Sequence, residues 1–120
     1  MLRVRTSLAP IALVLGALSL TVLSSTAALA DCDSADLCTA GECRLRQANV
    51  HPTCDQPRSC GSIDASDKTE LHNRLMINQQ CLAARMNVSQ CFSTSDTGHD
   101  QAIQAVRNAI ATCQYKYDQK

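Results

Sequence analysis

The chain contains no tryptophan and has only three aromatic side chains in 120 residues, which are Phe92, Tyr115 and Tyr117. Aromatic side chains bury large apolar areas, so little large apolar surface is available for a core. A single domain of this size is also near the lower limit at which a hydrophobic core suffices by itself. We therefore expect the fold to depend on covalent cross-links.

Clusters of one charge are also missing. The chain has 11 basic and 11 acidic residues, with no run of lysine and arginine and no basic stripe. Sequence-independent binding to nucleic acid relies on neutralising phosphates with such clusters. The sequence therefore carries no nucleic-acid signature and no signature of binding to a membrane surface.

A third absence concerns the spacing of cysteine. No two of the eight cysteines are separated by only two or three residues, so the C-x-x-C knuckles of zinc sites and thioredoxin-like motifs are missing. We expect no metal ion and no cofactor. Eight cysteines allow on the order of a hundred pairings, among which the spacing does not choose. We expect all of them to form structural disulfides: Cys32, Cys38, Cys43, Cys54, Cys60, Cys81, Cys91 and Cys113.

The first 30 residues have the three regions of a secretory signal peptide. Arg3 and Arg5 form a positive start, and the apolar run 8–23 follows. A stretch of small residues then ends in Ala-Leu-Ala at 28–30, which matches the pattern that a signal peptidase accepts. Cleavage after this triplet leaves a mature chain of residues 31–120, in which nine basic residues stand against eleven acidic ones.

Two other interpretations of this segment are weaker. A transmembrane anchor is disfavoured because the apolar run is shorter than the roughly 20 residues that a membrane span needs. A lipoprotein signal is disfavoured because Asp31, directly before Cys32, is charged where lipidation requires a small uncharged residue. We expect a secreted or periplasmic protein that keeps no membrane anchor after cleavage.

Export sets the redox environment of the cysteines. In oxidising compartments, an even set of cysteines in a short chain usually forms a disulfide framework. Each bridge adds roughly 2–4 kcal/mol of stability, so four bridges decide whether this domain folds. We expect the reduced chain to be unfolded or molten, which a loss of near-UV circular dichroism on reduction would show.

The mature chain is expected to be one mostly α-helical domain with two zones. Residues 31–66 combine five cysteines with several turn formers and predict a cysteine-rich, loop-dominated extension, with at most a short helix within 34–48. Residues 67–117 predict a helical hairpin, with helices over about 68–86 and 98–115. A connection of about ten residues makes two such helices antiparallel neighbours.

The first expected helix has an N-terminal signal and two stripes. Asp67 can cap it, and Glu70 completes the pattern of a capping box. Helical spacing aligns an apolar stripe formed by Leu71, Leu75, Leu82 and Met86. A polar stripe borders it and is either a structural hydrogen-bond network or the lining of a site; its members are Arg74, Asn78, Cys81 and Arg85.

The second expected helix begins near Gly98, and either Asp96 or Thr97 can cap it. Its apolar face contains Ile103, Val106, Ile110 and Tyr117. His99 lies in the first turn on the same side and therefore points towards the first helix. In an antiparallel hairpin, His99 and Asp96 would approach Arg85.

These three residues form the candidate catalytic site, with two open interpretations. In the first, His99 is a general base kept neutral by the helix dipole, next to Asp96, and Arg85 clamps a phosphate or stabilises developing negative charge. In the second, His99 packs between the helices and Arg85 pairs with Asp96 to hold the loop.

The stretch 60–113 resembles a small helical domain of bacterial polymorphic toxin systems, one of the families described as novel toxins. The matching residues are Cys60-Gly61, Arg74, Asn78, Cys81-Leu82-Ala83-Ala84-Arg85, Cys91-Phe92, Asp96-Thr97-Gly98-His99, Ala102, Ala105 and Cys113. The resemblance implies a disulfide-bonded α-hairpin whose polar positions, Arg74, Asn78, Arg85, Asp96 and His99, bind or act on a substrate. It also implies that the last four cysteines pair among themselves and the first four among themselves.

Two functions follow as hypotheses. The first is a toxin-like secreted or periplasmic effector, with hydrolysis as its candidate reaction, which acts on an unknown small substrate through His99, Asp96 and Arg85. The second is a non-enzymatic binding or inhibitory module, whose disulfides rigidify a surface for an unknown protein partner.

Overall fold

The computed structural model describes residues 30–94 and 96–120, and within them the protein is all-α. The predicted signal segment, residues 1–29, lies outside the described residues. The elements are η1 (Cys32–Ser34), α1 (Ala40–Gln47), α2 (Val50–Cys54), α3 (Lys68–Ser89) and α4 (Thr97–Asp118). The prediction of a mostly α-helical fold is confirmed. Among the described residues, no helix has the length and apolar character that a membrane crossing requires.

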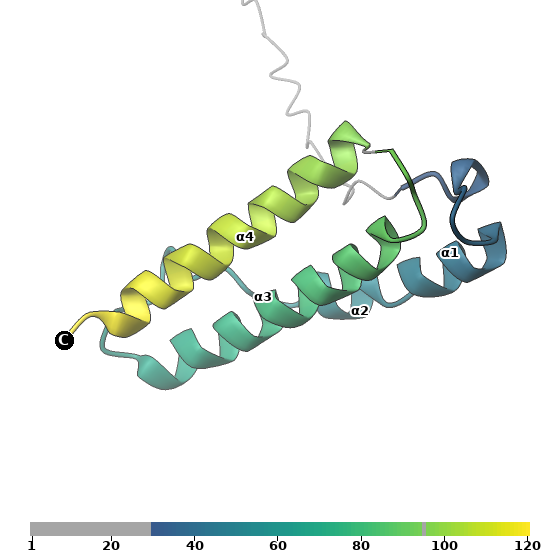
Figure 1. Ribbon diagram of the computed structural model, residues 1–120. Helices are drawn as coiled ribbons and strands as arrows, with labels where there is room; N and C mark the ends of the chain where they lie inside the picture. The colour runs from purple at the N-terminus through teal and green to yellow at the C-terminus, as the bar shows by residue number, and fades with distance from the viewer. Residues whose placement is uncertain (1–29, 95) are drawn as a thin grey trace, which may run out of the picture.

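The long helices α3 and α4 form the predicted antiparallel hairpin (Figure 1). Each of the two helices begins directly after an aspartate that caps it. The Asp67 carboxylate accepts a hydrogen bond from the Glu70 amide at 3.1 Å, and the Asp96 carboxylate accepts one from the Gly98 amide at 3.0 Å. Both aspartates therefore satisfy an amide that would otherwise lack a partner at a helix start.

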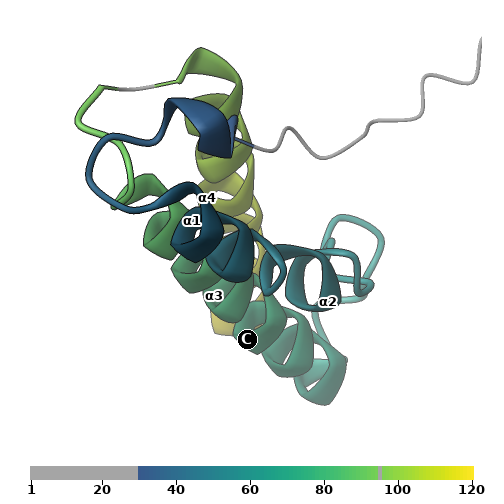
Figure 2. The ribbon, with the colours of Figure 1, turned by 90° about the vertical axis from the view of Figure 1, so that its right-hand side faces the viewer.

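The extension contains more helix than its composition predicts. Thr39 and Glu42 form a reciprocal capping box that starts α1, and α2 follows after a two-residue break. Both short helices pack against α3, as the view in Figure 2 shows, and neither packs against α4. Helix α3 is therefore the central element, with α4 on one side and α1 and α2 on another.

Four disulfides fasten these layers together, and all eight cysteines take part. The pairs are Cys32–Cys43, Cys38–Cys91, Cys54–Cys81 and Cys60–Cys113. The pairing that the toxin resemblance implied is wrong, since the second and third bridges each join the first four cysteines to the last four. The reason is the position of the extension. Because it packs along α3 and does not form a separate unit, its cysteines face those of the hairpin.

The extension is also tied to the loop between α3 and α4. The Asp36 and Leu37 amides donate to the Cys91 carbonyl, at 3.2 and 3.0 Å. The Asp36 carboxylate accepts bonds from the Ser93 hydroxyl and, at 2.8 Å, from the Ser93 amide. These bonds, the hydroxyl first, lower the pKa of Asp36 below its ordinary value. Together with the Cys38–Cys91 bridge, they hold the loop that leads into α4.

The core differs from the predicted apolar faces at two residues. Leu71 and Leu75 are buried against the Cys60–Cys113 bridge, as their stripe predicts. Met86, however, is 39% exposed. In the C-terminal half of α3 the buried side is the polar stripe, with Cys81 and Arg85. Tyr117, at the far end of α4, is 38% exposed.

Candidate functional site

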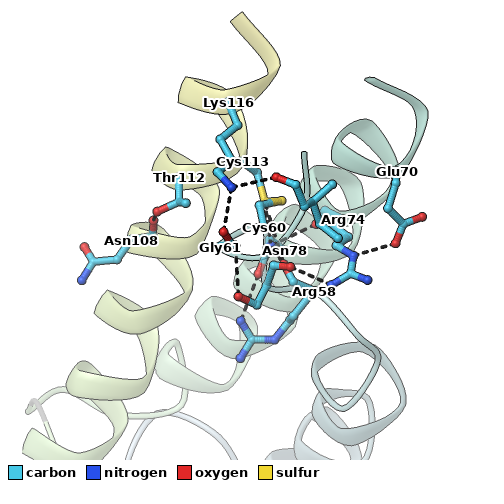
Figure 3. Close-up of a disulfide and its surroundings, with 12 residues drawn as sticks. Arg58, Cys60, Gly61, Glu70, Arg74, Asn78, Asn108, Thr112, Cys113 and Lys116 are labelled. Carbon is cyan, nitrogen blue, oxygen red and sulfur yellow. Dashed lines mark hydrogen bonds and ion pairs between the residues drawn. A yellow bond between two sulfur atoms is a disulfide. The ribbon is translucent and has the colours of Figure 1, made fainter. Parts of the chain in front are cut away.

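The polar residues of α3 fall into two separate centres. The first lies beside the Cys60–Cys113 disulfide and includes Asn78 and Arg74 (Figure 3). The second lies where α3 ends and α4 begins, and includes His99 and Arg85. The five polar positions singled out from the sequence are therefore not one site.

Asn78 is completely buried and forms hydrogen bonds through both atoms of its amide. Its Nδ2 donates to the Arg58 carbonyl at 2.7 Å and to the Arg74 carbonyl at 3.0 Å. Its Oδ1 accepts from Nη1 of Arg58 at 2.9 Å, while Nε of Arg58 donates to the Cys54 carbonyl. Asn78 and Arg58 thus hold the segment that leads to Cys60.

Arg74 supports the same segment. Its Nη1 donates to the Ser59 carbonyl at 2.7 Å, and its Nε pairs with Glu70 at 2.6 Å. On the other side, Nζ of Lys116 donates to the Gly61 and Ile63 carbonyls, both at 2.7 Å (Figure 3). Arg74 and Asn78 bond to main-chain carbonyls and to the side chains of Glu70 and Arg58. This is the pattern of a structural network.

We expect Asn78→Ala to lower the free energy of unfolding by about 2 kcal/mol, because it removes the hydrogen bonds that the Asn78 side chain forms with Arg58 and Arg74 and leaves the Arg58 carbonyl and Nη1 without this partner. Chemical denaturation of the oxidised protein measures this change. The matched control is Asn73→Ala, at an exposed position of the same helix, which should alter stability by less than about 0.5 kcal/mol. Equal effects of the two variants would contradict a structural role for Asn78.

The second centre is built around His99, which is 5% exposed in the first turn of α4. Its Nε2 lies 2.7 Å from the Ser89 hydroxyl and 3.1 Å from the Arg85 main-chain carbonyl. The sequence therefore placed His99 correctly, against the end of α3. Its Nδ1 is buried and has no hydrogen-bond partner among the described residues.

These contacts set the tautomer of the neutral ring. The Arg85 carbonyl can only accept a hydrogen bond, and we therefore assign the hydrogen to Nε2 and the free lone pair to Nδ1. The Ser89 hydroxyl donates to the same carbonyl at 3.3 Å and accepts from Nε2. A histidine that activates a serine must present the opposite state, a bare nitrogen facing the hydroxyl. In this geometry, His99 does not activate Ser89.

Arg85 enters this centre through its main chain and not through its guanidinium. The residue is 4% exposed, and its Nε and Nη1 have no hydrogen-bond partner among the described residues. Burial lowers the pKa of this guanidinium; the charge of Arg58 lowers it further, and that of Asp55 opposes the change. The two charges that act on this guanidinium, those of Arg58 and Asp55, both belong to the extension.

Asp96 does not complete a catalytic group. Its side chain is exposed and caps α4. Within residues 30–94 and 96–120, no ion pair joins Arg85 to Asp96. The structure thus brings His99 to the backbone of Arg85, but it assembles neither the catalytic trio nor the Arg85–Asp96 pair considered as its alternative.

A small cavity of about 120 Å³ adjoins His99. It has room for a few water molecules or a small polar group. No lysine or arginine lines it, whereas two carboxylates and three hydroxyl groups do. The lining residues are Ala30, Ser89, Phe92, Ser93, Thr94, Asp96, His99 and Asp100.

Two important residues were not singled out from the sequence. Arg58 stands in the predicted loop segment without a helical pattern to mark its direction. Ser89 is expected in the connection after the first helix, although α3 continues through it.

The described residues contain no cluster of histidine, cysteine and acidic side chains that fits a metal ion.

Comparison with protein-family models, with curated proteins and with solved structures finds no match to this chain. The toxin resemblance stays a prediction. What is established is a small, disulfide-rich, helical protein, and four disulfides indicate an oxidising, extracytoplasmic environment.

Proposed function

We propose that the chain is a non-enzymatic binding module that acts outside the cytoplasm. The observation that carries this proposal is the position of Nε2 of His99, 3.1 Å from the Arg85 carbonyl, an acceptor that assigns the hydrogen to Nε2 and so leaves no base facing Ser89. The other candidate catalytic groups are also committed elsewhere. Asp96 caps a helix, and the Arg85 guanidinium is buried.

Rigidity supports a binding role. The bridges connect the extension to both long helices, so the surface around α1 loses little conformational entropy when a partner binds. This surface carries two of the most exposed large apolar side chains, Leu37 at 63% and Leu45 at 72%. Leu37 directly precedes Cys38, and Leu45 follows Cys43 by two residues; both cysteines are in disulfides. We propose that the two leucines contact a protein partner.

Site-specific photo-crosslinking tests this proposal. A photoreactive residue at position 45, in the full-length gene expressed in its own cells, is expected to give one discrete adduct. The same residue at Gln104, which is exposed on α4, should give none. The adduct should disappear with Leu37→Glu and persist with His99→Gln, which keeps a donor near the Nε2 position but removes the base. Equal labelling from positions 45 and 104 would contradict the proposal.

A hydrolytic, toxin-like effector is the second candidate, favoured by the 2.7 Å Ser89–His99 contact beside a cavity. Its test is the growth of a bacterial host that exports the chain. Under the binding proposal, we expect the parent, Ser89→Ala and His99→Gln proteins to give the same growth. Arrest by the parent, together with normal growth of the two variants at equal protein levels, would establish the hydrolase and overturn the binding proposal.

A further inference from the structure

The cavity beside His99 has an unusual wall. Ala30 lines it and is only 6% exposed, although it is the last residue of the predicted signal peptide. The Gln47 side chain donates a hydrogen bond to the Ala30 carbonyl. Cleavage after Ala30 would therefore remove a buried wall of the cavity and release the Gln47 amide from its acceptor.

The same cleavage creates a charge at that place. Hydrolysis of the Ala30–Asp31 peptide bond by a signal peptidase adds one water molecule, breaks the C–N bond, and leaves a carboxylate on Ala30 and an α-ammonium group on Asp31. The nitrogen of Asp31 is bonded directly to the carbonyl carbon of Ala30, so the new cation begins at the cavity wall. In the uncleaved chain, this nitrogen donates no hydrogen bond to a residue that the structure describes.

The remaining lining suits a cation. Two acidic residues, Asp96 and Asp100, line the cavity, and no basic residue does. His99 also lines it, and its Nδ1 is buried without a hydrogen-bond partner among the described residues. The positive end of the α4 dipole opposes a cation, but it amounts to about half a charge and the two carboxylates outweigh it. Gln47, once released, offers its Oε1 as a further acceptor.

Local structure keeps the new terminus from moving away. The Asp31 carboxylate accepts from the Asp33 amide at 3.0 Å, and the Asp31 carbonyl accepts from the Ser34 amide at 3.1 Å. Cys32 follows directly, is 5% exposed, and is bonded to Cys43 on α1. Because both the side chain and the carbonyl of Asp31 are held, its amine has little freedom to move.

We propose that the cavity beside His99 is the binding site of the protein's own processed N-terminus, in which the α-ammonium group of Asp31 replaces Ala30. The inference depends on cleavage after Ala30 and is independent of the binding proposal. It makes processing a step that completes the fold at the start of α4, since the ammonium links η1 to the acidic first turn of that helix.

The experiment uses protein exported from the full-length gene. Intact mass and N-terminal sequencing should show a chain that begins at Asp31. A brief pulse of acetic anhydride then measures how fast the α-amine is acylated. An ammonium held by carboxylates has less of the reactive neutral form, so we expect acylation to be roughly tenfold slower in the folded protein than in the reduced, denatured chain.

Two variants isolate the proposed contact. Asp100→Asn should speed acylation of the folded protein severalfold, because it removes a carboxylate from the cavity. Asp118→Asn, at the other end of α4, should leave the rate unchanged. A different N-terminal residue, equal rates in folded and denatured protein, or equal effects of the two variants would each overturn the proposal. A nuclear Overhauser effect between Asp31 Hα and the His99 ring is expected as an independent readout.

Discussion

Replacing Cys60 and Cys113 together by alanine is expected to lower the free energy of unfolding by about 4 kcal/mol, because the bridge closes a loop with a sequence separation of 53 residues. It is the bridge that joins the segment before α3 to α4. It also packs against Leu71 and Leu75, so its loss weakens a buried cluster as well as releasing the chain. Denaturant unfolding monitored by circular dichroism measures the change.

The Cys32–Cys43 bridge provides the comparison. Its sequence separation is 11 residues, so the double alanine variant is expected to cost about 3 kcal/mol under the same relation. It should also leave the α3–α4 hairpin intact, because both cysteines lie in the extension. A smaller loss for the Cys60–Cys113 variant than for the Cys32–Cys43 variant would contradict this ranking.

Arg85→Met is expected to stabilise the protein by about 1–4 kcal/mol, since a buried cation without a bonded carboxylate is replaced by an apolar chain of similar length. Methionine retains the packing of the aliphatic part of the arginine side chain. The main-chain carbonyl of Arg85, which accepts from His99, is unaffected. Thermal and denaturant unfolding of the oxidised protein test the prediction.

The control for this variant is Arg107→Met on α4, where the arginine is exposed. Its stability should change by less than about 0.5 kcal/mol. Destabilisation by Arg85→Met of more than 1 kcal/mol would mean that the guanidinium has partners in solution. A gain in stability would agree with the view that burial of this charge weakens the fold. Arg85 would then serve a purpose other than stability.

Local sequence signals were sufficient for the hairpin. Asp67 and Asp96 cap the helices that they were predicted to cap, and helical spacing placed His99 against the end of α3. These features depend on contacts within a few residues or on one helix–helix interface. Such contacts follow from periodicity and from a short connection.

Other features depend on packing that the sequence does not encode locally. The polar stripe through Asn78, Cys81 and Arg85 is buried. Cys81 is bonded to Cys54 at the end of α2, and Asn78 is held by Arg58, which follows α2. The helices α1 and α2 that pack on α3 are too short and too polar to be recognised by periodicity. The bridges from Cys38 and Cys54 follow from the same packing. The burial of Arg85 without a pair to Asp96 was not encoded locally either, and the predicted catalytic group does not assemble.

A non-reducing peptide map tests the central claim most directly, namely that the cysteine-rich extension and the hairpin form one cross-linked body. Digestion of the oxidised protein should give four bridged pairs: Cys32–Cys43, Cys38–Cys91, Cys54–Cys81 and Cys60–Cys113. A map in which no bridge joins the first four cysteines to the last four would contradict it. In that case the extension would be a separate unit, and the burial of Arg85 and Asn78 would lose its explanation.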